Sequence, residues 1–268
     1  MIRQTTPVCS FYLELPYDAT WTVIAAALAG AFCLGVAKTG FPGIAIINIL
    51  LVAELFGTKN SIGIILPLLI VCDLVIYPMY RKYASWRQVW NLVPSTLIGV
   101  ALGWYFLKLI DDTTAKQVIG GIVLVMLVLQ LIREFRKTFL EHLPASKTFV
   151  FGSGLMIGIS TMMANAAGSV YSIYVLVRKL KKEDFLGIGA RFFLLINTLK
   201  VPFLVELDLI NRESLYLDAL LVPGVLLGIF LGKTLIQIVP QRIFEWLLYA
   251  FTLIAGIWFL FFPDILNK

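Results

Sequence analysis

The chain has 268 residues, of which 60% are hydrophobic and 14% charged, and its mean hydropathy is +0.91. A soluble domain is closer to half apolar and about a quarter charged, so this composition excludes a water-soluble globular protein and makes the lipid bilayer the surroundings of much of the chain. The net charge is +6, but the basic residues stand between apolar runs, where they determine membrane topology. Nucleic acid is therefore not expected as a partner.

Ten apolar segments follow one another along the chain, separated by short polar or charged stretches. A helix that spans a membrane needs about 20 apolar residues, whereas the strands of a membrane barrel would alternate with period two, a pattern not found here. The sequence therefore predicts an all-α polytopic membrane protein with about ten transmembrane segments. In chain order they cover residues 21–37, 42–56, 61–80, 88–107, 115–133, 148–164, 168–180, 184–205, 214–233 and 243–262.

Residues that could carry metal or catalytic chemistry are few and scattered. The three cysteines, Cys9, Cys33 and Cys72, lack metal-ligand spacing, and the single histidine, His142, lies in a charged loop. There is no phosphate-binding Walker motif and no nucleophile–base constellation. We expect no metal, no cofactor and no enzymatic activity.

The lysines and arginines are divided unequally between the two sides that the connections face. One side carries fourteen and the other six, while Arg191 and Lys200 fall inside a segment. Because every connection is short, the positive-inside rule applies. It places the fourteen-residue side in the cytoplasm and both termini on the extracytoplasmic side.

A motif of the form LVPxxLxGxxLG occurs twice, beginning at Leu92 and at Leu221. Upstream, Gly63, Asp73 and Pro78 match Gly187, Asn197 and Pro202 at one constant offset. The chain is thus expected to contain two homologous halves of five segments each. Since five is odd, the second half must enter the membrane in the opposite orientation, and such inverted repeats are a recurring plan of secondary transporters.

The resulting organisation has five parts. They are an extracytoplasmic tail (1–20) that is not a cleaved signal peptide, repeat 1 (21–137), a cytoplasmic linker (138–147), repeat 2 (148–263) and a C-terminal tail (264–268).

The second segment of each half is short and follows a helix breaker. Segments 42–56 and 168–180 would span about 22 Å and about 20 Å, against about 30 Å of hydrocarbon. A helix that begins inside the membrane leaves its first N–H groups unpaired and favours an anion there. We expect the two breaks near the midplane to bind substrate. The residues expected to do so are Lys38, Thr39, Gly40, Asn165 and Ala166. The alternative is an ordinary interfacial turn, with Lys38 reaching the headgroups.

Ionisable residues inside apolar segments form a second group of candidates, because a charge at the membrane centre costs at least about 2.5–3.5 kcal/mol. Asn197 and Lys200 share one helix face and are expected to bind substrate. Asp73 is expected to couple transport to protons, with a structural ion pair to a buried lysine as the alternative. Arg191, on nearly the opposite face from Lys200, and Asn48 are weaker candidates. Arg191 is expected near the cytoplasmic interface or in an ion pair, and Asn48 more often joins helices than binds substrate.

Four stretches resemble the TauE/SafE sulfite exporter family, also called TSUP or probable membrane transporter proteins. They are Gly35–Gly43, Gly63–Asp73, Met162–Gly168 and Phe192–Phe203. The likeness covers nearly the whole chain after residue 20. It implies a transporter of sulfite, organosulfonates or related anions in the bacterial inner membrane. The chain departs from many relatives at Lys38-Thr39-Gly40, where they carry a glycine-rich run, and at Arg191, where an aromatic residue is usual.

Two functions remain open at this point. One is a secondary transporter for a small anion that alternates access, coupled to protons or running down a gradient. The other is a passive anion channel that uses the same site. Whether the chain forms a homo-oligomer is also left open.

Overall fold

A computed structural model describes residues 16–39, 44–83, 85–180, 182–238 and 241–262, and every regular element in these ranges is helical. The prediction of an all-α protein is confirmed. The elements are η1 (Pro16–Asp18), α1 (Trp21–Lys38), α2 (Ala45–Phe56), α3 (Thr58–Tyr80), η3 (Arg81–Tyr83), α4 (Trp86–Trp90), α5 (Val93–Leu109), α6 (Asp112–Phe135), α7 (Lys137–His142), α8 (Lys147–Ala164), α9 (Gly168–Val177), α10 (Lys182–Glu206), α11 (Arg212–Ile238) and α12 (Gln241–Phe261).

Each of the ten predicted segments corresponds to an apolar helix. Within the described ranges, six helices are long and apolar enough to cross a membrane: α1, α3, α6, α8, α10 and α11. Shorter apolar helices are α2, α5, α9 and the Thr252–Phe261 part of α12. The predicted segment 88–107 is divided between α4 and α5, which begins at Val93. Pro94 lacks an N–H and fits only the first turn of a helix, so the helix restarts just before it.

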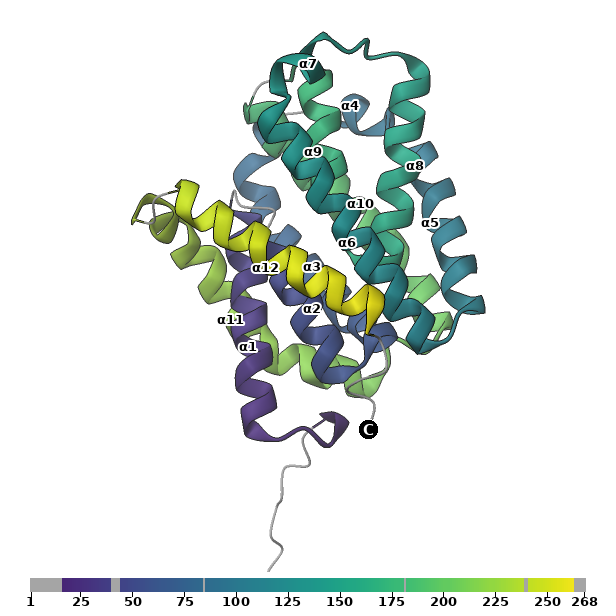
Figure 1. Cartoon of the computed structure of the whole chain (residues 1–268), viewed down its shortest axis with the longest axis vertical. Coiled ribbons are helices and arrows are strands. Elements are labelled where there is room, and N and C mark those ends of the chain that lie inside the picture. The colour runs from purple at the N-terminus through teal and green to yellow at the C-terminus, as the bar shows by residue number, and fades with distance from the viewer. Residues whose placement is uncertain (1–15, 40–43, 84, 181, 239–240, 263–268) are drawn as a thin grey trace, which may run out of the picture.

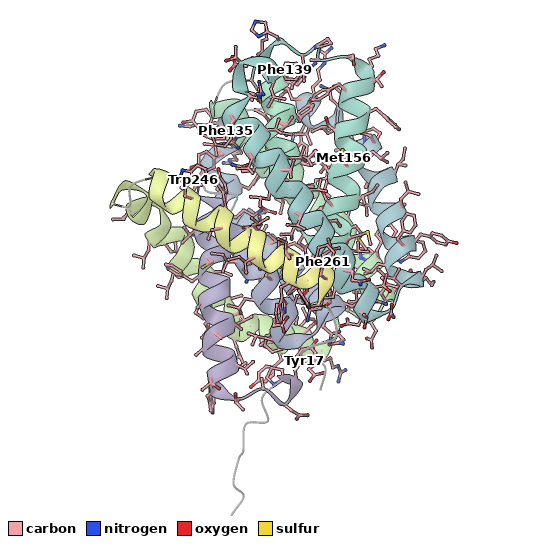
Figure 2. The ribbon with its side chains drawn as sticks, viewed as in Figure 1. Tyr17, Phe135, Phe139, Met156, Trp246 and Phe261 are labelled. Carbon is pink, nitrogen blue, oxygen red and sulfur yellow. The ribbon has the colours of Figure 1, made fainter. Side chains whose placement is uncertain are left out.

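Large apolar side chains cover the outside of the bundle. Phe135 on α6 and Trp246 and Phe261 on α12 are each at least 60% exposed and stand on the outer surface (Figure 2). A soluble protein would bury side chains of this size. The outer surface therefore suits contact with lipid.

The helices form two flanking pairs and a central layer (Figure 1). α5 lies along α8 on one flank, α1 lies along α11 on the other, and α6 crosses α12 in front of α3 and α10. The two ends of the bundle are here called the α7 end and the Tyr17 end, after α7 in Figure 1 and Tyr17 in Figure 2. α3 begins at the Tyr17 end and α10 at the α7 end, so the two run in opposite directions through the centre.

Glycines bring the backbones of each flanking pair into contact. A Cβ atom on Gly35 of α1 would overlap the backbone near Gly228 of α11. In the same way, a Cβ atom on Gly99 of α5 would overlap the backbone near Gly158 of α8. Any larger side chain would force the paired helices apart, which is costly in a close-packed interior. These two close contacts hold α1 against α11 and α5 against α8, and the short helices α2 and α9 lie between the two pairs (Figure 1).

Candidate functional site

Two interrupted helices approach each other near the centre of the bundle. α1 ends at Lys38 and α2 begins at Ala45, while α8 ends at Ala164 and α9 begins at Gly168. Neither α2 nor α9 has a side-chain hydrogen bond that caps its first turn. The first amides of both helices are therefore left without an intrahelical partner, and each helix start carries the positive end of a dipole.

Asn165 makes the turn that ends α8. Its φ of 51° lies in the left-handed region, which asparagine adopts more readily than most residues. Its backbone N–H returns to the carbonyl oxygens of Ser160 and Thr161. The turn sends the chain back toward the α7 end as α9, so that the tip remains inside the bundle.

A cavity of about 160 Å³ lies between the two breaks. Five of the residues expected at the site line it: Lys38, Asp73, Asn165, Ala166 and Asn197. The first residues of both broken helices, Ala45 and Gly168, also line it. The cavity therefore combines free helix-start amides with one lysine, one carboxylate and two amide side chains.

The Asp73 carboxylate binds the side chains of Lys38 and Asn197 at the centre of the cavity. Its Oδ1 lies 2.5 Å from the Lys38 Nζ, and its Oδ2 accepts a hydrogen bond of 2.7 Å from the Asn197 Nδ2. Asp73 is 2% exposed and Asn197 1%. The Lys38 ammonium also lies 5.3 Å from the ring centre of Phe193. The ion pair makes the buried centre formally neutral, which removes most of the cost of two separate charges in an apolar interior.

Lys200 lies behind the cavity and does not line it. It is fully buried, and its Nζ donates to the Thr161 carbonyl oxygen (2.6 Å), the Thr161 Oγ1 (3.2 Å) and the Asn165 Oδ1 (2.7 Å). Among the described residues no carboxylate lies within ion-pair distance of it. The ammonium instead faces the C-terminal carbonyls of α8, the negative end of that helix. Lys200 thus holds the tip of α8 to α10.

The side-chain amide of Asn165 joins three helices. Its Oδ1 accepts from Lys200 of α10, and its Nδ2 donates to the Ile62 carbonyl oxygen of α3 at 3.1 Å. Both ends of the amide are therefore occupied by protein groups. Asn165 therefore contributes to the cavity mainly by making the turn that places the start of α9 there.

Two other candidates, Thr39 and Asn48, do not line the cavity. The Thr39 Oγ1 donates to the Val36 carbonyl oxygen, and the side chain lies beside Gly232 of α11. Gly40 lies outside the described residues. Asn48 is fully buried beside Gly30 of α1, and among the described residues neither atom of its amide has a partner.

Arg191 lies on the α7 side of the bundle, among backbone acceptors and aromatic rings. Its guanidinium donates to the carbonyl oxygens of Gly187 and Arg81. The guanidinium carbon is 5.8 Å from the ring centre of Tyr77 and 6.0 Å from that of Trp86. The structure thus places its guanidinium beside the C-terminal end of α3 and outside the cavity lining.

Some lining residues had no candidate role in the sequence. Ser169 follows the break between α8 and α9, and Phe193 faces the Lys38 ammonium. Ser169 could have been found, because its position directly after the break puts its amide in the first turn of α9. Phe193 could not, since aromatic residues are common throughout apolar helices. Among the described residues no three His, Cys, Asp or Glu side chains gather closely enough to hold a metal.

Residues 22–259 match the family model described as sulfite exporter TauE/SafE. The chain belongs to this family. TauE/SafE is a family of membrane transporters, so the chain is a multi-pass membrane protein and not an enzyme. No curated protein and no solved structure matches it significantly.

Proposed function

We propose that this TauE/SafE chain is a secondary transporter that carries a small sulfite-like or sulfonate anion across the bacterial inner membrane. The cavity between the two helix breaks is its binding site. The observation that carries the proposal is Lys38, a cation held at the end of a broken helix, facing a cavity into which two uncapped helix starts also open. An oxyanion suits this set of donors, because it can accept from the ammonium and from helix-start amides together.

Asp73 gives the site a means of coupling to protons. While Asp73 is ionised it occupies Lys38, and an incoming anion must compete with it. A proton on Asp73 removes the negative charge and leaves the ammonium free for the substrate. The proton and the anion would then enter together, and a monovalent anion would be carried without net charge. Release of the proton restores the ion pair and expels the anion.

The contacts of the flanking pairs support the inverted repeat. The glycine contact between α1 and α11 joins the first segment of repeat 1 to the fourth segment of repeat 2. The contact between α5 and α8 joins the fourth segment of repeat 1 to the first segment of repeat 2. Both pairs are parallel: Gly228 and Gly232 lie beside Gly35 and Val36, as Gly99 and Gly103 lie beside Gly158 and Met162. Ten alternating crossings would give these directions.

The lining of the cavity supports an alternating mechanism. Ile76 of α3 and Leu186, Gly189 and Ala190 of α10 line it on the α7 side of Asp73. Toward the Tyr17 end, Leu34 of α1 and Leu69 of α3 line it as well. The cavity thus lies on both sides of the ion pair, and alternating access would open it to one side of the membrane at a time. Such opening would require the two halves to rock about the site.

Flux measurements on the purified chain in proteoliposomes test the proposal. We expect saturable uptake of labelled sulfite or of a sulfonate such as sulfoacetate, faster when the outside is acidic and when unlabelled anion is present inside. A passive channel would give conductance without acceleration by internal anion. The absence of saturable flux for sulfite, sulfonates and carboxylates alike would refute the transport proposal.

A further inference from the structure

A second hollow lies at the α7 end, between the starts of α5 and α8 and the end of α9. It has a volume of about 340 Å³ and shares no lining residue with the central cavity. We call it the α5–α8 pocket, and its lining includes Asn91, Pro94, Ser95, Lys147, Phe151 and Arg178. Its volume falls in the range of small-molecule sites, about 300–1,000 Å³.

The charge of the α5–α8 pocket is positive within the part of the chain that the structure describes. Lys147 and Arg178 are its two charged lining residues, and neither forms an ion pair with a described carboxylate. Asn91 adds a hydrogen-bonding side chain, whereas the Ser95 hydroxyl donates to the Leu92 carbonyl oxygen. The start of α5 has no side-chain cap, so its first N–H groups add to the positive potential. The chemistry favours a phosphate-like anion.

The apolar surroundings indicate where that anion comes from. Phe151 lines the pocket and is 51% exposed. On α5, Ile98 and Leu102 are exposed. They lie four and eight residues after Pro94, so they extend the same helix face away from the pocket. A soluble anion would gain nothing from this apolar strip, whereas an acyl chain could lie along it.

The equivalent crossing in the other half lacks these features. In the α1–α11 pair, Ile24 occupies the position that Lys147 has in the α5–α8 pair. Leu220 occupies the position of Asn91. Ile24 is buried in the core. A polar, cationic hollow is therefore not needed to pack two helices in this way, and it is specific to one half.

We propose that the α5–α8 pocket binds the phosphate headgroup of an anionic phospholipid, with an acyl chain along the exposed face of α5. Basic pockets between membrane helices are suited to such headgroups. The site is independent of the anion cavity and of the proposed transport activity, since it requires only that the chain be embedded in a bilayer.

Thermal unfolding of the detergent-purified full chain tests this lipid site. Phosphatidylglycerol should raise the unfolding temperature, and phosphatidylcholine with the same acyl chains should not. A basic residue that contacts the headgroup is taken to contribute about 1 kcal/mol, which is about fivefold in affinity. The Lys147→Gln/Arg178→Gln variant should thus need about 25-fold more phosphatidylglycerol for half the effect. Lys147→Gln alone, a change at an exposed position, should need about fivefold more.

The matched control is Lys82→Gln/Arg87→Gln, which removes two exposed cations at the same end of the bundle, in η3 and α4. This variant should respond to phosphatidylglycerol as the wild type does. An equal response to both lipids, or an unchanged response in both pocket variants, would refute the site. If glycerol 3-phosphate or inorganic phosphate stabilises the chain as much as phosphatidylglycerol, the pocket takes a soluble phosphate and the lipid assignment is wrong.

Discussion

The Lys38 ammonium and the Asp73 carboxylate form an ion pair of 2.5 Å that ties the broken end of α1 to the middle of α3. The second carboxylate oxygen of Asp73 accepts a hydrogen bond from Asn197, the residue matched to Asp73 by the constant sequence offset. The cation best placed to bind an anion is therefore already paired. In the proposed mechanism, either a competing anion or a proton separates the two before substrate binds.

The first prediction concerns Lys38. In Lys38→Met the anion loses a charge-assisted hydrogen bond worth about 1.5–3 kcal/mol, so affinity for the transported anion should fall by about ten- to 150-fold. Calorimetric titration of the purified variant with sulfite or sulfoacetate measures this. Lys82→Met, which removes an exposed lysine of η3, should bind as tightly as the wild type. Wild-type affinity in Lys38→Met would exclude Lys38 as a substrate ligand.

The second prediction concerns Asp73 and pH. Protonation of Asp73 frees Lys38, so wild-type affinity for the anion should rise as pH falls. The side chain that Asp73→Asn introduces is neutral at every pH, so affinity should become independent of pH, and uptake driven by a pH gradient should be lost while anion exchange persists. Binding titrations at several pH values and paired flux assays measure both effects.

Glu206→Gln is the matched control for Asp73→Asn, because Glu206 is an exposed carboxylate paired with Lys108 at the Tyr17 end. It should keep the wild-type pH dependence. A well-folded Asp73→Asn protein whose binding still strengthened at low pH would assign the proton to another group. Failure of that variant to fold would favour a structural ion pair, the alternative raised by the sequence.

The third prediction concerns topology. The distribution of basic residues and the parallel course of α1 and α11 both agree with ten crossings. A reporter placed after residue 268 should therefore be active on the extracytoplasmic side, and one placed in the 138–147 linker should be active in the cytoplasm. Cytoplasmic activity of the C-terminal fusion would mean that one apolar helix does not cross.

Much of this architecture could be predicted from the sequence, because a bilayer requires long apolar helices and makes interruptions in them conspicuous. The break at Lys38 and the break at Asn165 were both found in this way. The match of Asp73 with Asn197 was found from the constant offset between the halves. The hydrogen bond between those two side chains could not be predicted, because it depends on how closely α3 and α10 cross.

The directions of the side chains at the two helix breaks could not be predicted from the sequence. Thr39 was expected at the site, but its hydroxyl bonds to the backbone of α1 and its side chain lies beside α11. Lys200 was expected to share the face of Asn197 and to bind substrate, but its ammonium reaches the end of α8 and does not line the cavity. Helical periodicity gives the face of a residue, whereas the backbone carbonyls that a long side chain can reach depend on tertiary packing.

The fourth prediction concerns the α5–α8 crossing. A Cβ atom on Gly158 would overlap the backbone of α5, whereas one on Gly152, also in α8, would meet nothing within 4 Å. Gly158→Ala should therefore destabilise the protein by about 1–3 kcal/mol, the usual cost of overpacking, and Gly152→Ala should not. Unfolding temperatures of the two variants in detergent give the comparison. Equal stability would mean that α5 and α8 are further apart than described.

The last prediction concerns Lys200, which we expect to act through Asn165. In Lys200→Met the Thr161 carbonyl and the Asn165 amide oxygen lose their donor. The tip of α8 should then loosen, and anion affinity should fall by at least about tenfold, as for loss of one charge-assisted bond. Arg191→Met should leave affinity near the wild-type value, because that guanidinium lies outside the cavity lining.

A double-mutant cycle separates positioning from direct contact. If Lys200 acts by holding Asn165, then Lys200→Met and Asn165→Ala disturb the same tip, and the double variant should bind little worse than the weaker single variant. Additive losses would instead mean that Lys200 reaches the anion by itself, because independent contributions add. Unchanged binding in Lys200→Met together with weak binding in Arg191→Met would show that the opposite face of α10 meets the substrate.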